Sequence, residues 1–154
     1  YFVRKTLFQG GIMQQYTSHS VNETESIAKE FAAKLSPGDV IAFLGGLGAG
    51  KTAFVRGLFE GLGCKGEAAS PTFAIVHEYP GSIPLYHFDM YRVHTLDDLY
   101  STGFFDYMEQ GGILAIEWSE NIAGVLDEEQ TIFIDIEKTG ETTRSIRIYG
   151  GGKF

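Results

Sequence analysis

A glycine-rich segment at residues 45–52, reading GGLGAGKT, constrains the fold of this chain more than any other feature. It fits the pattern G-x-x-x-x-G-K-[ST], with Gly45, Gly50, Lys51 and Thr52 in the fixed places. In that pattern the glycines let backbone N–H groups wrap a phosphate, the lysine reaches the β and γ phosphates, and the hydroxyl can ligate Mg²⁺. A helix opening at Gly50 would add the positive end of its dipole. The segment therefore predicts a phosphate-binding loop.

The residues on either side of the segment have the order that such a loop requires. Before it, residues 40–44 are an uninterrupted apolar run, typical of a strand buried on both faces of a sheet. After it, apolar residues recur at spacings of three and four up to Leu62, and Gly63 fits a helix end. Strand, glycine loop and helix thus follow one another, which disfavours an ordinary glycine-rich turn.

Composition bounds the class of protein. A chain of 154 residues that is 44% hydrophobic predicts one domain with a substantial core. A net charge of −8 argues against electrostatically driven binding to nucleic acid or anionic membranes. Cys64 is the single cysteine, which excludes an internal disulfide and suits a reducing compartment. Because no apolar run approaches the roughly 20 residues that span a bilayer, we expect a cytoplasmic protein.

The chain is expected to divide into one domain with two short extensions. Residues 1–12 contain Leu-Phe-Gln-Gly at positions 7–10, which looks like a protease-site remnant of an expression vector, with Met13 as the natural first residue. Residues 13–150 would form the P-loop domain. Residues 151–154 would be a C-terminal tail.

Periodicity and turn residues predict the remaining elements. A helix over residues 22–35 would be capped by Asn22 and Glu25. The other expected elements are strands at 73–79 and 85–91, a short helix at 95–100, a strand at 113–118, and a hairpin of 131–137 with 142–149. Together they predict an α/β, P-loop NTPase-like three-layer sandwich whose central sheet is mainly parallel, with antiparallel strands added.

Two carboxylates follow apolar strands, where a nucleotide hydrolase commonly places its acidic groups. Glu117 closes the strand of residues 113–116, and Asp89 closes that of residues 85–88. Either residue could instead simply leave the core as its strand reaches solvent. Thr72, in a Ser-Pro-Thr loop, fits a segment that senses a γ phosphate, or an ordinary turn.

Four motifs together resemble one family. GGLGAGKT at 45–52, SPTF at 70–73, HFDMYR at 87–92 and EWSE at 117–120 occur in the order and spacing of the bacterial TsaE (YjeE) family. The resemblance covers nearly all of residues 20–150. It implies a P-loop ATPase of tRNA threonylcarbamoyladenosine biosynthesis.

The resemblance also implies cofactors and partners. Such a protein binds ATP or ADP with Mg²⁺ and works with the TsaB and TsaD proteins. Together they form the threonylcarbamoyl group on adenosine 37 of tRNAs that read codons beginning with adenine. Its ATPase activity is weak alone, and it would meet tRNA only through the complex, in keeping with the acidic charge.

Site residues carry over from the family by motif. Lys51 would bind phosphates, Thr52 and Glu117 would hold Mg²⁺, and Asp89 would support hydrolysis together with Lys51 and Glu117. The expected nucleotide contacts are Gly45, Gly46, Leu47, Gly48, Ala49, Gly50, Lys51, Thr52, Ala53, Thr24, Thr72 and Trp118.

Two other functions are compatible with a phosphate-binding loop. One is a small-molecule kinase, whose ATP use would rise with an acceptor. The other is a nucleotide-dependent binding switch with little turnover.

Overall fold

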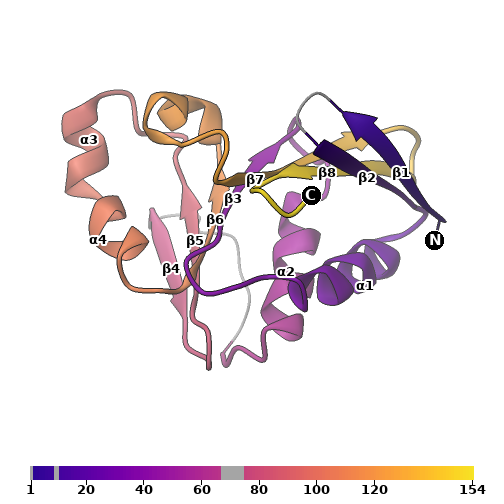
Figure 1. Cartoon of the computed structure of the whole chain (residues 1–154), viewed down its shortest axis with the longest axis horizontal. Coiled ribbons are helices and arrows are strands. Elements are labelled where there is room, and N and C mark those ends of the chain that lie inside the picture. The colour runs from indigo at the N-terminus through magenta and orange to yellow at the C-terminus, as the bar shows by residue number, and fades with distance from the viewer. Residues whose placement is uncertain (1, 9–10, 67–74) are drawn as a thin grey trace.

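The computed structural model describes residues 2–8, 11–66 and 75–154, and of residues 2–8 and 11–12 the backbone alone (Figure 1). The described residues form strands, α-helices and one 3₁₀ segment, η1. In chain order these are β1 (Phe2–Phe8), β2 (Gly11–Ser18), α1 (Val21–Ala32), β3 (Val40–Leu44), α2 (Lys51–Gly61), β4 (Val76–Tyr79), β5 (Leu85–Asp89), α3 (Leu96–Ser101), α4 (Phe104–Met108), β6 (Ile113–Glu117), η1 (Ser119–Val125), β7 (Thr131–Lys138) and β8 (Arg144–Gly150).

The strands form one eight-stranded sheet in the order β1-β2-β8-β7-β3-β6-β5-β4. Strand β3 pairs in parallel with β7 on one side and with β6 on the other, and β6 pairs in parallel with β5. The outer pairs are antiparallel. This arrangement confirms the predicted α/β fold, with a parallel centre and antiparallel strands added. It also brings the carboxyl ends of four strands to one edge, where open α/β sheets bind ligands.

Helices cover both faces of the sheet. Along β3, Ile41 and Phe43 enter the core beneath α1 and α2, whereas Val40 enters a second core beneath α3, α4 and η1. The alternation arises because successive side chains of a strand point to opposite faces. Figure 1 shows α1 and α2 lying together, apart from α3 and α4. The two cores give the predicted three layers.

Helices α1 and α2 pack closely through two glycines. A Cβ atom on Gly57 would lie 2.3 Å from the carbonyl oxygen of Glu25, and one on Gly61 would lie 2.6 Å from the Cβ atom of Ala32. Distances this short leave no room for even a methyl group. The contact holds α1, from Glu25 to Ala32, against the helix that follows the glycine loop.

The limits of α1 differ from those predicted. Ser20, in extended conformation, caps the helix by accepting a hydrogen bond from the backbone N–H of Glu23. The proposed cap of Asn22 and Glu25 is therefore wrong, because a serine two residues earlier provides the hydroxyl in the conformation that an N-cap needs. The helix ends at Ala32, and Leu35 is buried from the following turn.

Residues outside the expected domain also take part in the fold. Strand β1 pairs with β2 along its length, so residues 2–8 extend the sheet, whatever their origin. At the other end, Gly150 and Phe154 exchange backbone hydrogen bonds, and the Phe154 ring lies 5.2 Å from that of Phe31 between centroids. Residues 151–154 therefore fold back onto α1 and do not extend as a tail.

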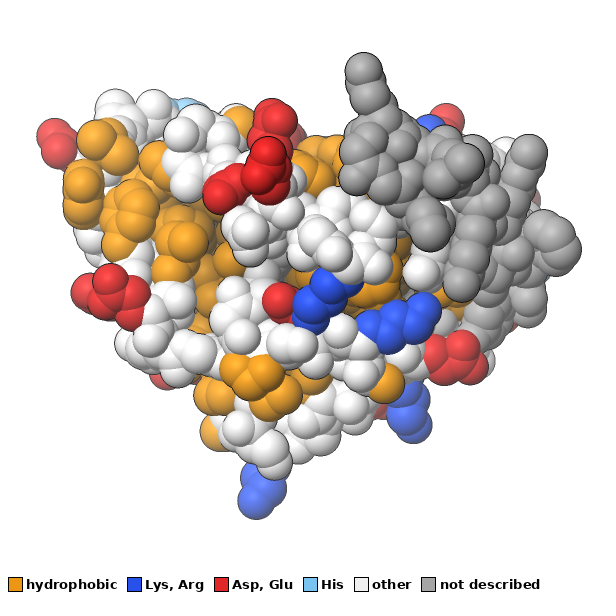
Figure 2. All heavy atoms as spheres, viewed as in Figure 1, with side chains coloured by type: hydrophobic (Ala, Val, Ile, Leu, Met, Phe, Trp, Pro, Cys, Tyr) orange, Lys and Arg blue, Asp and Glu red, His pale blue; other side chains and the backbone are white. Residues whose placement is uncertain are grey.

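The surface over α3 and α4 is apolar. Figure 2 shows hydrophobic side chains gathered at that end of the molecule, where Leu96, Tyr100 and Met108 are exposed. Acidic residues flank them, including Asp97 and Asp106 in the first turns of the two helices. None of the helices in the described part of the chain is long and apolar enough to cross a membrane.

Candidate nucleotide site

The glycine loop joins the end of β3 to the start of α2 and requires glycine at several positions. Gly45, Gly48 and Gly50 have φ angles of 128°, 73° and 108°, in the left-handed region that other residues rarely adopt. At Gly45 a Cβ atom would also lie 2.3 Å from the carbonyl oxygen of Ile136 in β7. The backbone path of the loop therefore depends on the glycines that the motif contains.

The remaining residues of the loop divide into buried and exposed positions. Ala49 and Ala53 are buried, whereas Leu47 is 87% exposed at the tip. Gly46 has open space where a side chain would lie. The first intrahelical bond of α2 is donated by Phe54 to Gly50, 3.1 Å away. Helical N–H groups before that point have no intrahelical acceptor, so the start of α2 offers donors to an anion.

Lys51 lies at the mouth of the loop. Its side chain is 8% exposed, and its Nζ donates a hydrogen bond of 3.1 Å to the carbonyl oxygen of Gly45. The same Nζ lies 5.6 Å from the centroid of the Trp118 ring. The ammonium is thus held at the loop by one neutral acceptor and one aromatic face, both weaker partners than a phosphate.

Trp118 has an unusual backbone conformation for a large side chain. Directly after β6 it adopts φ 56° and ψ 39°, which costs about 1–2 kcal/mol for an L-residue other than glycine. Its ring packs against Tyr91 with centroids 4.9 Å apart. Backbone strain of this kind is concentrated at functional sites, and here it turns the indole toward Lys51.

The two predicted carboxylates end adjacent strands in register. Asp89 of β5 pairs with Glu117 of β6. Glu117 is 7% exposed, and its Oε2 lies 2.7 Å from Nε2 of the fully buried His87. Asp89 is partly exposed and accepts a hydrogen bond from the backbone N–H of Tyr91 at 3.0 Å. The sheet therefore brings both carboxylates to one edge.

Further hydrogen bonds join this acidic edge to the strand that precedes the loop. The hydroxyl of Ser119 donates to the carbonyl oxygen of Phe43 at 3.1 Å, which fixes the end of β6 against β3. The N–H of Met90 donates to the carbonyl oxygen of Glu117 at 3.0 Å. Lys51, Trp118, Glu117 and Asp89 thus come together from segments far apart in the sequence.

The donor set fits Mg²⁺ better than a transition metal. Thr52 in the first turn of α2 and Glu117 at the end of β6 offer oxygen, which Mg²⁺ prefers. Within the described residues no group of three or more His, Cys, Asp or Glu could hold a metal alone.

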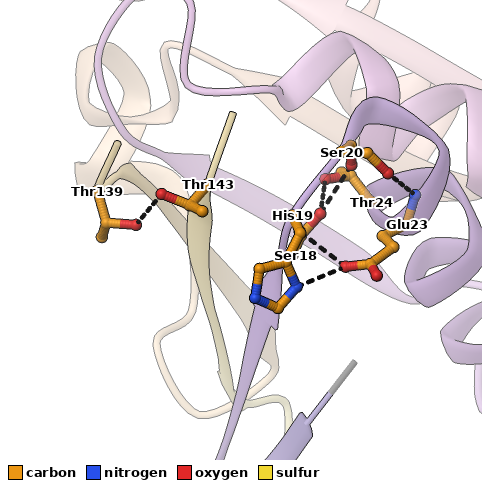
Figure 3. Close-up of polar contacts among 7 residues, drawn as sticks. All are labelled: Ser18, His19, Ser20, Glu23, Thr24, Thr139 and Thr143. Atoms are coloured by element: carbon orange, nitrogen blue, oxygen red, sulfur yellow. Dashed lines mark hydrogen bonds and ion pairs between the residues drawn. The ribbon is translucent and has the colours of Figure 1, made fainter. Parts of the chain in front are cut away.

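Thr24 lies inside the start of α1 (Figure 3). It is 2% exposed, and its Oγ1 lies 2.7 Å from Oγ of Ser18, which donates to the carbonyl oxygen of Ser20. Beside it, the N–H of His19 donates to Glu23, and this bond is the largest cause that lowers the pKa of the Glu23 carboxyl. The predicted contact of Thr24 with adenine stays a prediction.

Arg144 was missing from the sequence-based site. At the start of β8 its guanidinium reaches the glycine loop, where Nε donates to the carbonyl oxygen of Ala49 at 3.0 Å and Nη2 to that of Gly48 at 3.2 Å. No motif marks this arginine, and only the pairing of β8 between β2 and β7 brings it to the loop. His87, which was not among the predicted site residues, also belongs to this edge, because its ring bonds Glu117.

Thr72 belongs to residues 67–74, which lie outside the described residues, so its predicted role stays a prediction. On the β7 side of the loop is an open cavity of about 430 Å³. It is lined by Gly45, Gly46, Leu47, Ala49, Asp135, Ile136, Glu137, Lys138 and Arg147. The glycine loop is thus accessible from this side.

The chain has a buried parallel strand, then a loop whose glycines have positive φ angles, and then a helix that begins at a lysine. These three features define a P-loop NTPase-like α/β protein. Comparison with known sequences identifies the group. The family model described as "Threonylcarbamoyl adenosine biosynthesis protein TsaE" matches residues 18–146. The chain belongs to the TsaE family.

Individual relatives agree with this assignment. The TsaE protein of Bacillus subtilis is 42% identical over 137 residues, covering 87% of this chain and 85% of the relative. That of Aquifex aeolicus is 38% identical over 143 residues, covering 90% and 97%. Both are named tRNA threonylcarbamoyladenosine biosynthesis proteins. The crystal structure of Bacillus subtilis YdiB superposes with a TM-score of 0.75 at 34% identity, covering 99% of this chain and 89% of that one.

Proposed function

We propose that this protein binds and hydrolyses ATP with Mg²⁺ as an accessory factor in forming threonylcarbamoyladenosine on tRNA. The observation that carries the proposal is the meeting of Lys51, Trp118, Glu117 and Asp89 beside the glycine loop. A phosphate-binding loop with two carboxylates at the neighbouring strand ends is the arrangement that P-loop hydrolases use. The names of the relatives supply the pathway.

Each residue of the site has a distinct part in this proposal. The N–H groups of the loop and of the first turn of α2 bind the phosphates, and Lys51 exchanges the carbonyl oxygen of Gly45 for phosphate oxygens. Thr52 and Glu117 hold Mg²⁺, which neutralises the charge that develops on the phosphates. Asp89, less buried than Glu117, orients the attacking water.

Surface charge supports an indirect encounter with tRNA. The chain carries 20 Asp and Glu against 12 Lys and Arg. A phosphate backbone is bound chiefly by clustered Lys and Arg, so this surface would repel a free tRNA. We therefore propose that TsaB and TsaD hold the tRNA, and that this protein docks on them and uses ATP to drive their cycle.

Steady-state ATP hydrolysis tests the proposal, measured for the purified chain alone and with the TsaB and TsaD proteins of the same organism. Lys51→Ala is the blank, because it lacks the phosphate-binding ammonium. Turnover that rises with the partners and is lost in the variant supports the accessory ATPase. ATP binding without any response to the partners would overturn the pathway part of the proposal. Unchanged ATP affinity in Lys51→Ala would refute the role of the lysine.

A further inference from the structure

The guanidinium of Arg144 makes four hydrogen bonds to described residues, all to main-chain carbonyl oxygens. Two acceptors, Gly48 and Ala49, belong to the glycine loop. The other two, Gly140 at 3.3 Å and Thr143 at 3.0 Å, belong to the turn between β7 and β8 and are both reached by Nη1. One side chain therefore joins two segments that are more than 90 residues apart in the sequence.

These bonds set the orientation of the peptide groups in the loop. In a trans peptide the C=O and the following N–H point in opposite directions. When the carbonyl oxygens of Gly48 and Ala49 accept from Arg144, the N–H groups of Ala49 and Gly50 are turned away from the guanidinium. The N–H of Ala49 bonds to Gly46 within the loop. The N–H of Gly50, at the start of α2, is directed to the opposite side of the loop from Arg144.

A loop with this many glycines needs contacts from outside the loop to keep it in one conformation. Glycine loses more conformational freedom on ordering than any other residue, and glycine occupies four of the eight positions from 45 to 52. The tip residue Leu47 is 87% exposed and adds little packing. Arg144 supplies a rigid, planar group with fixed donor directions, which a lysine cannot reproduce.

The turn that shares the guanidinium has its own internal bonds. The N–H of Thr139 donates to the carbonyl oxygen of Thr143 at 3.1 Å, and the two hydroxyls are also 3.1 Å apart (Figure 3). In register, Arg144 pairs with Ser18 on one side and with Lys138 on the other. The backbone of Arg144 is thus held between two neighbouring strands of the sheet.

We propose that Arg144 is a positioning residue for nucleotide binding, which holds the glycine loop in its phosphate-binding conformation and ties it to the β7–β8 turn. This inference rests on the proposed function, since it concerns the same site. In this proposal Arg144 acts through the peptide groups of Gly48 and Ala49 and not by its own contact with the nucleotide. Its positive charge behind the loop also favours the bound anion.

Variants at this position test the inference through ATP affinity and amide hydrogen exchange of the loop. Arg144→Ala should weaken ATP binding about 10- to 100-fold, since small misplacements of binding groups have effects of this size. Arg144→Lys keeps the positive charge but loses the planar guanidinium with its fixed donor directions. Its affinity for ATP should therefore lie between those of wild type and Arg144→Ala. Without nucleotide, amides of residues 46–53 should exchange faster in both variants. Added guanidinium should partly restore ATP binding to Arg144→Ala.

Arg56→Ala is the matched control, because Arg56 lies on α2 and pairs with Glu25 at 2.9 Å on a half-exposed surface. It removes the same charge and should leave ATP affinity and exchange unchanged. If Arg144→Ala does not fold, Arg144→Lys decides the question by the same two readouts. Wild-type affinity and wild-type exchange in the folded variant would overturn the inference. Failure of the proposed function would differ, because the wild-type chain itself would then lack ATP binding or turnover.

Discussion

Asp89 and Glu117 end neighbouring parallel strands at the same level, yet their carboxylates lie in different surroundings. Glu117 is almost buried and is fixed by the ring of His87. Asp89 is partly exposed, and within the described part of the chain its carboxylate accepts a local bond from the N–H of Tyr91. In the sequence both appear as an acidic residue after an apolar run. The two residues differ in burial and in hydrogen-bond partners, which the sequence pattern does not reveal.

The difference suggests different tasks. A buried carboxylate with a fixed orientation suits a constant ligand of a cation, because little reorganisation is needed when the ion binds. A carboxylate nearer to solvent suits contact with a water that changes at each turnover. Replacing each residue, and then the histidine that distinguishes them, shows whether this division holds.

Glu117→Gln should have the largest effect. The amide keeps the volume and one oxygen but loses the charge that faces the cation, so hydrolysis should fall about 1,000-fold. The Mg²⁺ concentration for half-maximal activity should also rise. Single-turnover hydrolysis across a Mg²⁺ titration measures both. Glu120→Gln, at an exposed position of the same motif, is the control and should behave as wild type. An unaltered Mg²⁺ dependence in Glu117→Gln would contradict the ligand role.

Asp89→Ala should slow hydrolysis about 100-fold, a usual contribution of a residue that handles the proton of the attacking group. ATP affinity should change little, because the carboxylate is not assigned to the ground-state phosphates. Asp89→Asn keeps an oxygen for the N–H of Tyr91 and should lose hydrolysis to a similar extent. Measured dissociation constants and turnover rates separate the two effects. An equal loss of binding and hydrolysis would sink the assignment.

His87→Phe tests what makes Glu117 different. The phenyl ring fills the space of the imidazole but donates no hydrogen bond, so the buried carboxylate loses its partner. The free energy of unfolding should fall by about 2 kcal/mol. Urea denaturation measures it, with His77→Phe as a control, since His77 is only partly buried. A variant as stable as wild type would mean that Glu117 finds another donor or water.

The smallest predicted effect is a change in intrinsic fluorescence, which is measured on the unsubstituted protein. Trp118 is the single tryptophan of the chain, and its ring lies 5.6 Å from the ammonium of Lys51. A cation–π contact of this kind is worth about 0.5–1 kcal/mol. When phosphate draws the ammonium away, the intrinsic fluorescence should change with ATP concentration. Lys51→Ala should lack most of this change. A response in the variant as large as in wild type would mean that the indole senses something other than the lysine.

Sequence patterns predict the parts of the fold that are held by apolar burial. Strands β3 and β6 are found because nearly every residue in them is apolar and buried. Strand β2 is missed because Gln14 and Ser18, which it turns inward on either side of the core residue Tyr16, are polar and are buried with hydrogen-bond partners. A polar inward face gives no hydrophobic alternation to detect.

The same limit applies to the site. Lys51, Thr52, Glu117 and Asp89 are predicted because each follows a local pattern of loop or strand end. Arg144 and His87 are missed as parts of the site because their partners lie far away in the chain, and only strand order and register bring them there. Local sequence patterns predict the residues that carry the reactive groups. The hydrogen bonds that orient those groups depend on the tertiary fold.

The glycine contacts between α1 and α2 limit how the site can move. A methyl group does not fit between these helices, so sliding of one over the other would produce immediate backbone collisions. We therefore expect α2, which begins at the glycine loop, and α1, which carries Thr24, to move together. Spectroscopic labels on the two helices would keep a constant separation through an ATP cycle. The distance between labels on these two helices would be a fixed reference, and displacement of any other segment can be measured relative to it.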